Sequence, residues 1–288
     1  MAPVIKTEKI THIYSAGTVF EHTALSDVSF EALRGEYIGI IGHTGSGKST
    51  FIQTLNGLIR PTSGTVFFDG TDIRQSKERT RDIRFKVGLV FQYPEYQLFE
   101  ETVFNDIAFG PKNMGLNAHE VAERVREAAG FVGLREDDLE KSPFELSGGL
   151  RRRAAIAGVI AMRPEVLIAD EPTAGLDPAG SSEIIANIGA YRRSTGATII
   201  IVTHSMEEIA QNADRVTVFD GGRIVMDAPP AAAFSRSDEL SAMGLGVPAA
   251  TAIANRLRAR GLPIAGGIIT ADGLRAALRE LRRGAGSA

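Results

Sequence analysis

The nine residues GHTGSGKST, Gly42–Thr50, constrain the fold of this chain more than any other stretch. They follow the apolar run YIGII and precede a predicted helix. Two glycines, a lysine and a serine at this spacing form a phosphate-binding loop, because the glycines let successive N–H groups turn inward toward an anion. A chance glycine-rich turn needs neither the strand before it nor the helix after it. The sequence therefore predicts a nucleoside triphosphate site on an α/β sheet.

The members of this loop have distinct expected roles. Lys48 is expected to reach the terminal phosphates, and the Ser49 hydroxyl is expected to take one position around Mg²⁺. The other members are expected to surround the nucleotide: Gly42, His43, Thr44, Gly45, Ser46, Gly47 and Thr50.

Carboxylates suited to hydrolysis follow a second apolar run. In VLIADEP, Val166–Pro172, four apolar residues predict a buried strand, so Asp170 and Glu171 emerge at its carboxyl end, where open α/β sheets bind ligands. We expect Asp170 to hold Mg²⁺ through its water shell and Glu171 to polarise the attacking water. An isolated Asp-Glu pair is commonplace and can simply cap the next helix. Its combination with the phosphate loop predicts a hydrolytic site.

Polar residues also end two further apolar runs. Gln92 follows VGLVF, and His204 follows IIIVT. A lone histidine is usually an ordinary surface or core residue, but at these strand ends both side chains are expected near the γ-phosphate and the water. The predicted catalytic residues are thus Glu171, His204, Gln92 and Lys48. The predicted metal ligands are Ser49, Gln92 and Asp170.

The distribution of apolar residues predicts an α/β fold with a mostly parallel core sheet. Nearly continuous apolar runs, typical of strands buried on both faces, predict strands at Tyr37–Gly42, Val87–Gln92, Val166–Asp170, Thr198–Thr203 and Arg215–Asp220. Alternating polarity predicts an N-terminal antiparallel β subdomain with strands at Lys9–Tyr14, Ala24–Ala32 and Gly64–Gly70.

Helical patterns interrupt and follow this sheet. Strand signals vanish between Gln92 and Pro164, where Ala118–Val132 and Ser147–Ala161 have helical periodicity. We therefore expect a helical subdomain at about 93–163, inserted into a nucleotide-binding domain of residues 1–235. Residues 236–288 are expected to form a small C-terminal helical extension with two short helices, the second capped by Thr270.

Composition excludes several classes of function. The chain of 288 residues has no cysteine, which excludes disulfides, thiolate metal sites and cysteine catalysis. A net charge of −3 gives no indication of nucleic acid or of an anionic membrane surface as a partner. The N-terminus lacks the apolar core of a signal peptide, and the longest apolar runs are too short to span a bilayer. If the protein works at a membrane, other chains are expected to supply the span.

The segment FQYPEYQLFEETV, residues 91–103, combines aromatic, leucine and acidic side chains. Pro94 should end the preceding strand and favour extended geometry at Tyr93. One interpretation is a surface loop whose aromatic side chains pack back onto the core of the chain. The other is a contact surface for a partner protein.

The order of motifs resembles that of the ATPase subunits of ATP-binding cassette (ABC) systems. The features that carry the resemblance, over residues 4–228, are ELSGGLRRRAAIAG at Glu145–Gly158, AGLD at Ala174–Asp177, Gln92, the Asp-Glu strand and His204. The resemblance implies a P-loop NTPase fold and two subunits that sandwich two ATP molecules. Each ATP would lie between the phosphate loop of one subunit and a second segment of the other, formed by Ser147, Gly148 and Gly149.

The same resemblance assigns further residues. Asp177 is implied to link the two active sites, and Tyr14 to stack on adenine, with Phe20 as a rival because SAGTVFEH lengthens its loop. Leu150 stands where the family has glutamine, which predicts weakened or asymmetric closure of the dimer. The sequence assigns no chemical role to the neighbouring arginines, Arg152 and Arg153.

Phe91–Gly115 strongly resembles the partner-contacting segment of ATPases from energy-coupling factor (ECF) transporters. LNGLIRPTSG, LRRRAAIAGVIAM and the His-Thr pair of the phosphate loop are also similar, the pair most of all to the second ATPase of systems with two unlike ATPases. The resemblance implies import of vitamins or transition-metal ions at the cytoplasmic face of the membrane. Its implied partners are a second ABC ATPase, like or unlike, a transmembrane scaffold and a substrate-binding membrane subunit. The C-terminal extension resembles a dimer contact of these ATPases.

Three alternatives remain at this point. The first is a conventional ABC importer or exporter. The second is a non-transport ABC ATPase acting on nucleic acid or ribosomes, a class that tends to have tandem cassettes, long coiled coils or basic arms. The third is a P-loop kinase or GTPase, which would not need the Ser-Gly-Gly loop.

Overall fold

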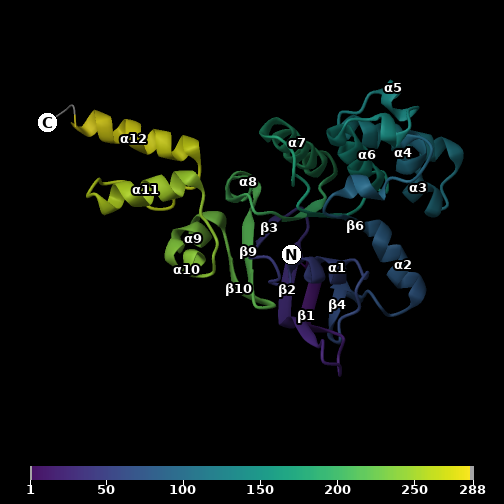
Figure 1. The fold of residues 1–288 in the computed structure, drawn as a ribbon, viewed down its shortest axis with the longest axis horizontal. Coiled ribbons are helices and arrows are strands. Elements are labelled where there is room, and N and C mark those ends of the chain that lie inside the picture. Colours follow the sequence, from purple (N-terminus) through teal and green to yellow (C-terminus); the bar gives the residue numbers. More distant parts are fainter. Residues whose placement is uncertain (1, 286–288) are drawn as a thin grey trace. The chain divides into compact units, whose positions relative to one another are not determined.

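The computed structural model describes residues 2–285 (Figure 1). These residues form two compact units. The first unit consists of residues 2–36 and 49–202, and the second of residues 37–48 and 203–285. The boundary therefore falls within the phosphate loop, between Lys48 and Ser49.

The first unit contains the predicted antiparallel sheet, in the order β2-β1-β4-β5. Its strands are β1 (Pro3–Tyr14), β2 (His22–Leu33), β4 (Ser63–Phe68) and β5 (Thr71–Asp72). Burial alternates along β2, as expected for a sheet with one covered face. The predicted strand at Lys9–Tyr14 is thus correct but too short, because it pairs with β2 back to Pro3.

Three parallel strands of the first unit position the predicted catalytic carboxylates. They are β6 (Val87–Val90), β7 (Val166–Asp170) and β8 (Thr198–Val202), and each is buried along its whole length. In their registers Val90 lies beside Ala169 and Asp170 lies beside Val202. The carboxyl ends of the three strands therefore share one edge.

Helices occupy the segment between β6 and β7, as predicted. They are η1 (Pro94–Gln97), α3 (Val103–Asn113), α4 (Ala118–Phe131), α5 (Glu136–Leu139), η2 (Pro143–Glu145) and α6 (Gly148–Ile160). Every residue of this segment is described, and none of them lies in a strand. Helices α2 (Lys77–Lys86) and α7 (Pro178–Thr195) also belong to this unit but lie outside the segment.

The expected geometry of Tyr93 is wrong. Tyr93 adopts a left-handed conformation, with φ 54° and ψ 56°, rather than an extended one. Its carbonyl accepts a hydrogen bond from the N–H of Tyr96 at 3.2 Å, which closes the η1 turn directly after it. Proline chiefly disfavours the right-handed helical region for the preceding residue, and the contacts of this turn decide between the remaining regions.

The second unit begins with β3 (Tyr37–Ile41), which pairs in parallel with β9 (Arg215–Asp220); β9 pairs in turn with the antiparallel β10 (Arg223–Ala228). The phosphate loop connects β3 to α1 (Lys48–Leu55). The unit continues through α8 (Met206–Asn212), α9 (Pro230–Ser235) and α10 (Ser237–Ala242).

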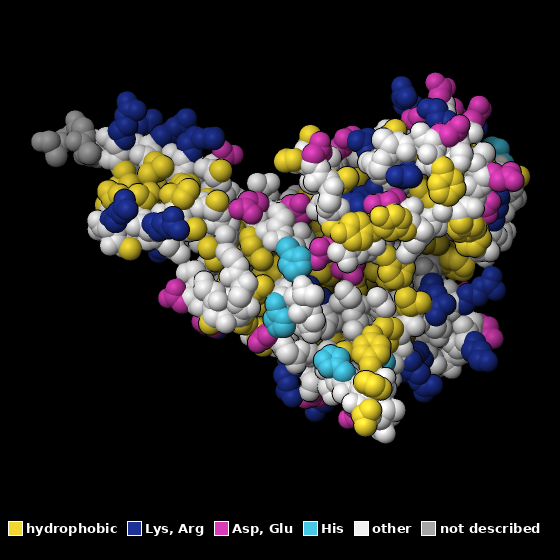
Figure 2. All heavy atoms as spheres, in the orientation of Figure 1, with side chains coloured by type: hydrophobic (Ala, Val, Ile, Leu, Met, Phe, Trp, Pro, Cys, Tyr) yellow, Lys and Arg dark blue, Asp and Glu magenta, His cyan; other side chains and the backbone are white. Residues whose placement is uncertain are grey.

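A helical hairpin ends the described chain, made of α11 (Ala249–Ala259) and α12 (Ala271–Ala285). The Thr270 hydroxyl accepts a hydrogen bond from the Gly273 N–H at 3.2 Å, which confirms the predicted cap. The small core of the hairpin consists of Ala250, Ala254, Ile264 and Leu274. Figure 2 shows apolar side chains gathered between the two helices and basic side chains along the outer face of α12. Among residues 2–285, no helix combines the length and the apolar character that crossing a membrane requires.

Candidate nucleotide site

The phosphate loop is closed around the ammonium group of Lys48. Its Nζ donates to the carbonyl oxygens of Gly42 at 2.7 Å and His43 at 2.8 Å. The side chain is only 6% exposed, because α1 begins at Lys48 and the loop folds over it. The second unit thus gathers the predicted residues from Gly42 to Lys48 around one buried cation. Such a cation suits the binding of terminal phosphates.

The turn between β9 and β10 supports this loop. A Cβ atom at Gly42 would lie 2.4 Å from the carbonyl oxygen of Phe219, so only glycine fits there. The N–H of Gly222 donates to the carbonyl oxygen of Ser46 at 3.1 Å. The loop conformation is therefore fixed by residues that lie far along the chain.

His43 makes a contact that the sequence did not reveal. Its Nε2 lies 3.0 Å from Oδ1 of Asp220, and its Nδ1 lies 2.7 Å from the carbonyl oxygen of Thr44. Both neighbours are hydrogen-bond acceptors, so the ring nitrogen that carries the proton donates to its neighbour. The sequence shows that the loop contains a histidine, but it does not indicate that the partner of this histidine lies 177 residues away.

The first unit brings the predicted Asp-Glu pair and Gln92 to one sheet edge, because β6 and β7 are parallel neighbours. Asp170 is buried at the end of β7. Glu171, directly after it, adopts a left-handed φ of 46°, and its N–H donates to Val202 at 2.8 Å. The backbone turn at Glu171 is therefore held by β8, the strand that pairs with β7.

Other predicted residues lie at exposed positions. His204 is exposed and follows β8 after Thr203. Tyr14 ends β1, and its hydroxyl lies 3.2 Å from Oγ1 of Thr50 in the phosphate motif. Phe20 lies in the β1–β2 loop and is 81% exposed. The hydrogen bond links Tyr14, and not Phe20, to the phosphate motif.

Ser147 and Asp177 both cap helices in this chain. The Ser147 hydroxyl accepts from the Leu150 N–H at 3.4 Å at the start of α6. The Asp177 carboxylate accepts from the Gly180 N–H at 2.7 Å at the start of α7. A Cβ atom placed on Gly148 would meet no atom within 4 Å, so the N-terminal end of α6 is open to an incoming group.

The segment Tyr93–Val103 does not pack its aromatic side chains into the core. Tyr96 is 84% exposed and Phe99 is 62% exposed, which contradicts the self-packing interpretation. The N–H groups of Phe99 and Glu100 donate to the carboxylate of Asp106 on α3 at 3.1 and 3.3 Å. Burial raises the pKa of Asp106, although these N–H donors act to lower it.

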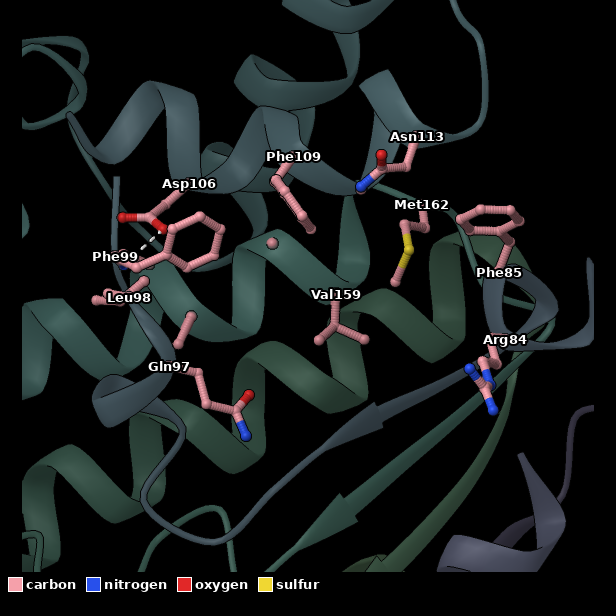
Figure 3. Close-up of a pocket in the computed structure, with 14 residues that line it drawn as sticks. Arg84, Phe85, Gln97, Leu98, Phe99, Asp106, Phe109, Asn113, Val159 and Met162 are labelled. Carbon is pink, nitrogen blue, oxygen red and sulfur yellow. Dashed lines mark hydrogen bonds between the residues drawn. The ribbon is translucent and has the colours of Figure 1, made fainter. Parts of the chain in front are cut away.

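A hollow with an apolar lining lies beside this segment (Figure 3). The rings of Phe99 and Phe109 meet edge to face, with centroids 5.1 Å apart. The other apolar side chains of the lining include Phe85, Leu98, Val159 and Met162. An exposed hollow with this lining is typical of a protein-binding surface.

Known proteins are similar to this chain over most of its length. The ABC transporter family matches residues 25–174. The energy-coupling factor transporter ATP-binding protein EcfA2 of Symbiobacterium thermophilum is 53% identical over 277 residues, which cover 96% of each chain. EcfA2 of Caldanaerobacter subterraneus is 51% identical over 93% of this chain and 94% of its own.

Solved structures are similar as well. CbiO1 of Clostridium perfringens, part of the ABC transporter complex cbiONQ, is 36% identical, with a TM-score of 0.75 over 90% of this chain and 96% of its own. The ATP-binding cassette MJ0796, a dimer bound to ADP and phosphate, is 27% identical, with a TM-score of 0.71 over 78% of this chain and 98% of its own. The chain therefore belongs to the ABC transporter family and, within it, to the ATP-binding proteins of energy-coupling factor transporters.

Proposed function

We propose that this chain is the ATP-hydrolysing, energy-coupling subunit of an ECF-type importer. The proposal rests on the sequence identity to EcfA2 proteins, which exceeds 50% over nearly the whole of both chains. The buried ammonium of Lys48 and the carboxylate of Glu171 support the proposal, since phosphate binding and water activation need groups of these kinds.

The proposed catalytic roles follow from chemistry. Lys48 neutralises charge on the terminal phosphates, Glu171 polarises the attacking water, and His204 contacts the γ-phosphate. Gln92 orients the same water. Tyr14 stacks on the adenine base of ATP.

Mg²⁺ fits the oxygen donors available in the first unit. Ser49, Gln92 and Asp170 offer a hydroxyl, an amide oxygen and a carboxylate. Within residues 2–285 no group of three or more histidine and acidic side chains forms a metal cage. Mg²⁺ needs none, since it combines one or two carboxylates with water and nucleotide phosphates. Bound there, it would neutralise charge on the phosphates.

Two such subunits would bind ATP between them. Ser147, Gly148 and Gly149 would offer N–H groups and a hydroxyl to the ATP held by the other subunit, and Asp177 would link the two sites. Leu150 removes one hydrogen-bonding side chain from this contact, which favours asymmetric closure. The hollow of the C-terminal hairpin, lined by Leu262, Pro263, Ala277 and Leu281 among others, would add a second contact between the subunits.

The membrane partner would dock at the Tyr93–Val103 segment and the hollow beside it. Exposed aromatic rings next to acidic side chains suit a half-buried interface with a polar rim. The partner is a transmembrane scaffold that also holds a substrate-binding membrane subunit. Docked in this way, the chain would lie at the cytoplasmic face of the membrane and drive import of vitamins or transition-metal ions.

Reversing the charges of Glu100 and Glu101 tests this docking. The Glu100→Lys/Glu101→Lys chain is expected to lose co-purification with the membrane scaffold, because the acidic rim of the proposed interface then has the opposite charge. The control is Glu136→Lys/Asp137→Lys, an adjacent acidic pair on α5. Equal co-purification of both variants would contradict the docking surface.

A further inference from the structure

Arg152 is a buried cation outside the predicted catalytic group. Its side chain is 3% exposed, although it belongs to α6 in a run of three arginines. Nε and one terminal nitrogen donate to the two carboxylate oxygens of Glu95, at 2.9 and 2.6 Å. The planar guanidinium matches a carboxylate in this two-bond geometry, which a lysine cannot reproduce.

The other terminal nitrogen of Arg152 contacts a third segment. It donates to the carbonyl oxygens of Ala174 at 2.5 Å and Pro172 at 3.3 Å. The ring of Tyr93, in its left-handed conformation, has its centroid 5.7 Å from the guanidinium carbon. The guanidinium therefore links its own helix, α6, to two segments that are distant from it in sequence.

Glu95 is also held as an anion. Its side chain is 12% exposed. Burial acts to raise the pKa of Glu95, but the net pKa is lowered, because hydrogen bonds from Arg152 and from the Glu95 N–H act together with the positive charges of Arg152 and Arg151. Breaking such a pair leaves one buried charge without its partner, which is costly, whereas the intact pair alone adds little stability.

The three segments joined by Arg152 each belong to a different part of the proposed mechanism. Glu95 lies in η1, three residues after Gln92 and at the start of the segment proposed to face the membrane scaffold. Arg152 itself lies one turn into the helix capped by Ser147. Pro172 and Ala174 lie in the loop between Glu171 and Asp177.

We propose that Arg152 is the positioning residue through which docking of the membrane scaffold sets the Ser147 end of α6 and the Glu171–Asp177 loop. The inference rests on the proposed function. Arg152 touches no nucleotide; it acts by holding η1, α6 and this loop in one arrangement. Glu95 supplies the anchor on the partner side, and rotation of η1 on docking moves the other two segments with it.

The test uses the chain purified with the second ATPase and the transmembrane scaffold. ATP hydrolysis of this complex is divided by that of the ATPase pair alone, to give a partner-dependence ratio. Arg152→Lys, which keeps the charge but loses the fork, and Glu95→Gln are expected to move the ratio about tenfold toward one. The control is Glu183→Gln, which removes the ion pair of the adjacent Arg153 on the same helix and should leave the ratio unchanged.

The outcomes separate this inference from the proposed function. A purely structural role predicts that both rates fall together with the Tm while the ratio holds; that result, or failure of both variants to assemble, would overturn the inference. A wild-type ratio of one would also overturn it. Failure of the wild-type chain to form the complex would instead refute the proposed function.

Discussion

The phosphate loop and the junction around Arg152 are each built on a buried cation, but their contacts differ in range. Lys48 donates to carbonyl oxygens five and six residues before it. Arg152 pairs with a carboxylate 57 residues before it and with carbonyl oxygens 20 and 22 residues after it. The ammonium contacts of Lys48 are local, so they can persist while segments distant in sequence move. A site made of distant segments passes the movement of one segment to the others, which is what coupling requires.

Lys48→Ala is the change with the largest expected effect on hydrolysis. Without the ammonium, charge developing on the phosphates is not neutralised, so turnover should fall by more than about 10³-fold. ATP turnover of the purified chain measures this. Lys77→Ala, which removes an exposed lysine at the start of α2, is the control and should hydrolyse ATP normally. Wild-type turnover by Lys48→Ala would refute the assignment of the loop.

Glu171→Gln should reduce hydrolysis by roughly 10² to 10³-fold, since the water loses its base while phosphate binding persists. The variant is expected to accumulate a dimer in the presence of ATP, which size-exclusion chromatography can detect. Glu165→Gln changes a glutamate just before the other end of β7 and serves as the control. Normal hydrolysis by Glu171→Gln would assign the base to another residue.

Glu95→Gln tests how much the buried Arg152–Glu95 pair contributes to stability. Because Arg152 would keep only a neutral acceptor in a buried site, the free energy of unfolding should fall by about 1–3 kcal/mol. Glu127→Gln is the control, since the Arg163–Glu127 pair is about two-fifths exposed on both sides and should contribute less than about 1 kcal/mol. Equal losses in urea unfolding would show that burial does not distinguish the two pairs.

Asp138→Asn has the smallest expected effect and tests a local ion pair. Hydrogen bonding from Lys141, three residues away, lowers the pKa of Asp138 to about 2. A depressed pKa stabilises the fold above the unfolded pKa of about 3.9, and this stabilisation disappears as the pH falls toward 2. The variant should therefore be less stable than wild type between pH 5 and 7, by an amount that shrinks at about pH 3.5. A difference independent of pH would contradict the ion pair.

Features of the fold that depend on neighbouring residues were predictable from the sequence. Val166–Asp170 and Arg215–Asp220 match β7 and β9 because their apolar runs end at charged residues. The Thr270 cap is confirmed because capping depends on neighbouring residues. Helix α2 was not predicted, since KERTRDIRFK is almost entirely charged and only Ile83 of it is buried.

Contacts between distant segments were not predictable. Nothing in the run of three arginines distinguishes Arg152 from Arg153, and Glu95 is one acidic residue among several in its segment. Likewise, the sequence placed His43 in the phosphate loop but did not indicate Asp220 as its partner. The left-handed geometry of Tyr93 follows from the η1 turn. The general preference for extended geometry before proline does not predict this turn.

We propose that this chain hydrolyses ATP with one region and docks on a membrane scaffold with another. Scaffold co-purification and ATP hydrolysis, measured in the same preparations of Lys48→Ala and Glu100→Lys/Glu101→Lys, test whether the two regions act separately. We predict that Lys48→Ala assembles with the scaffold but does not hydrolyse ATP, and that the charge-reversed chain hydrolyses ATP but does not assemble. Loss of both properties in both variants would contradict the claim.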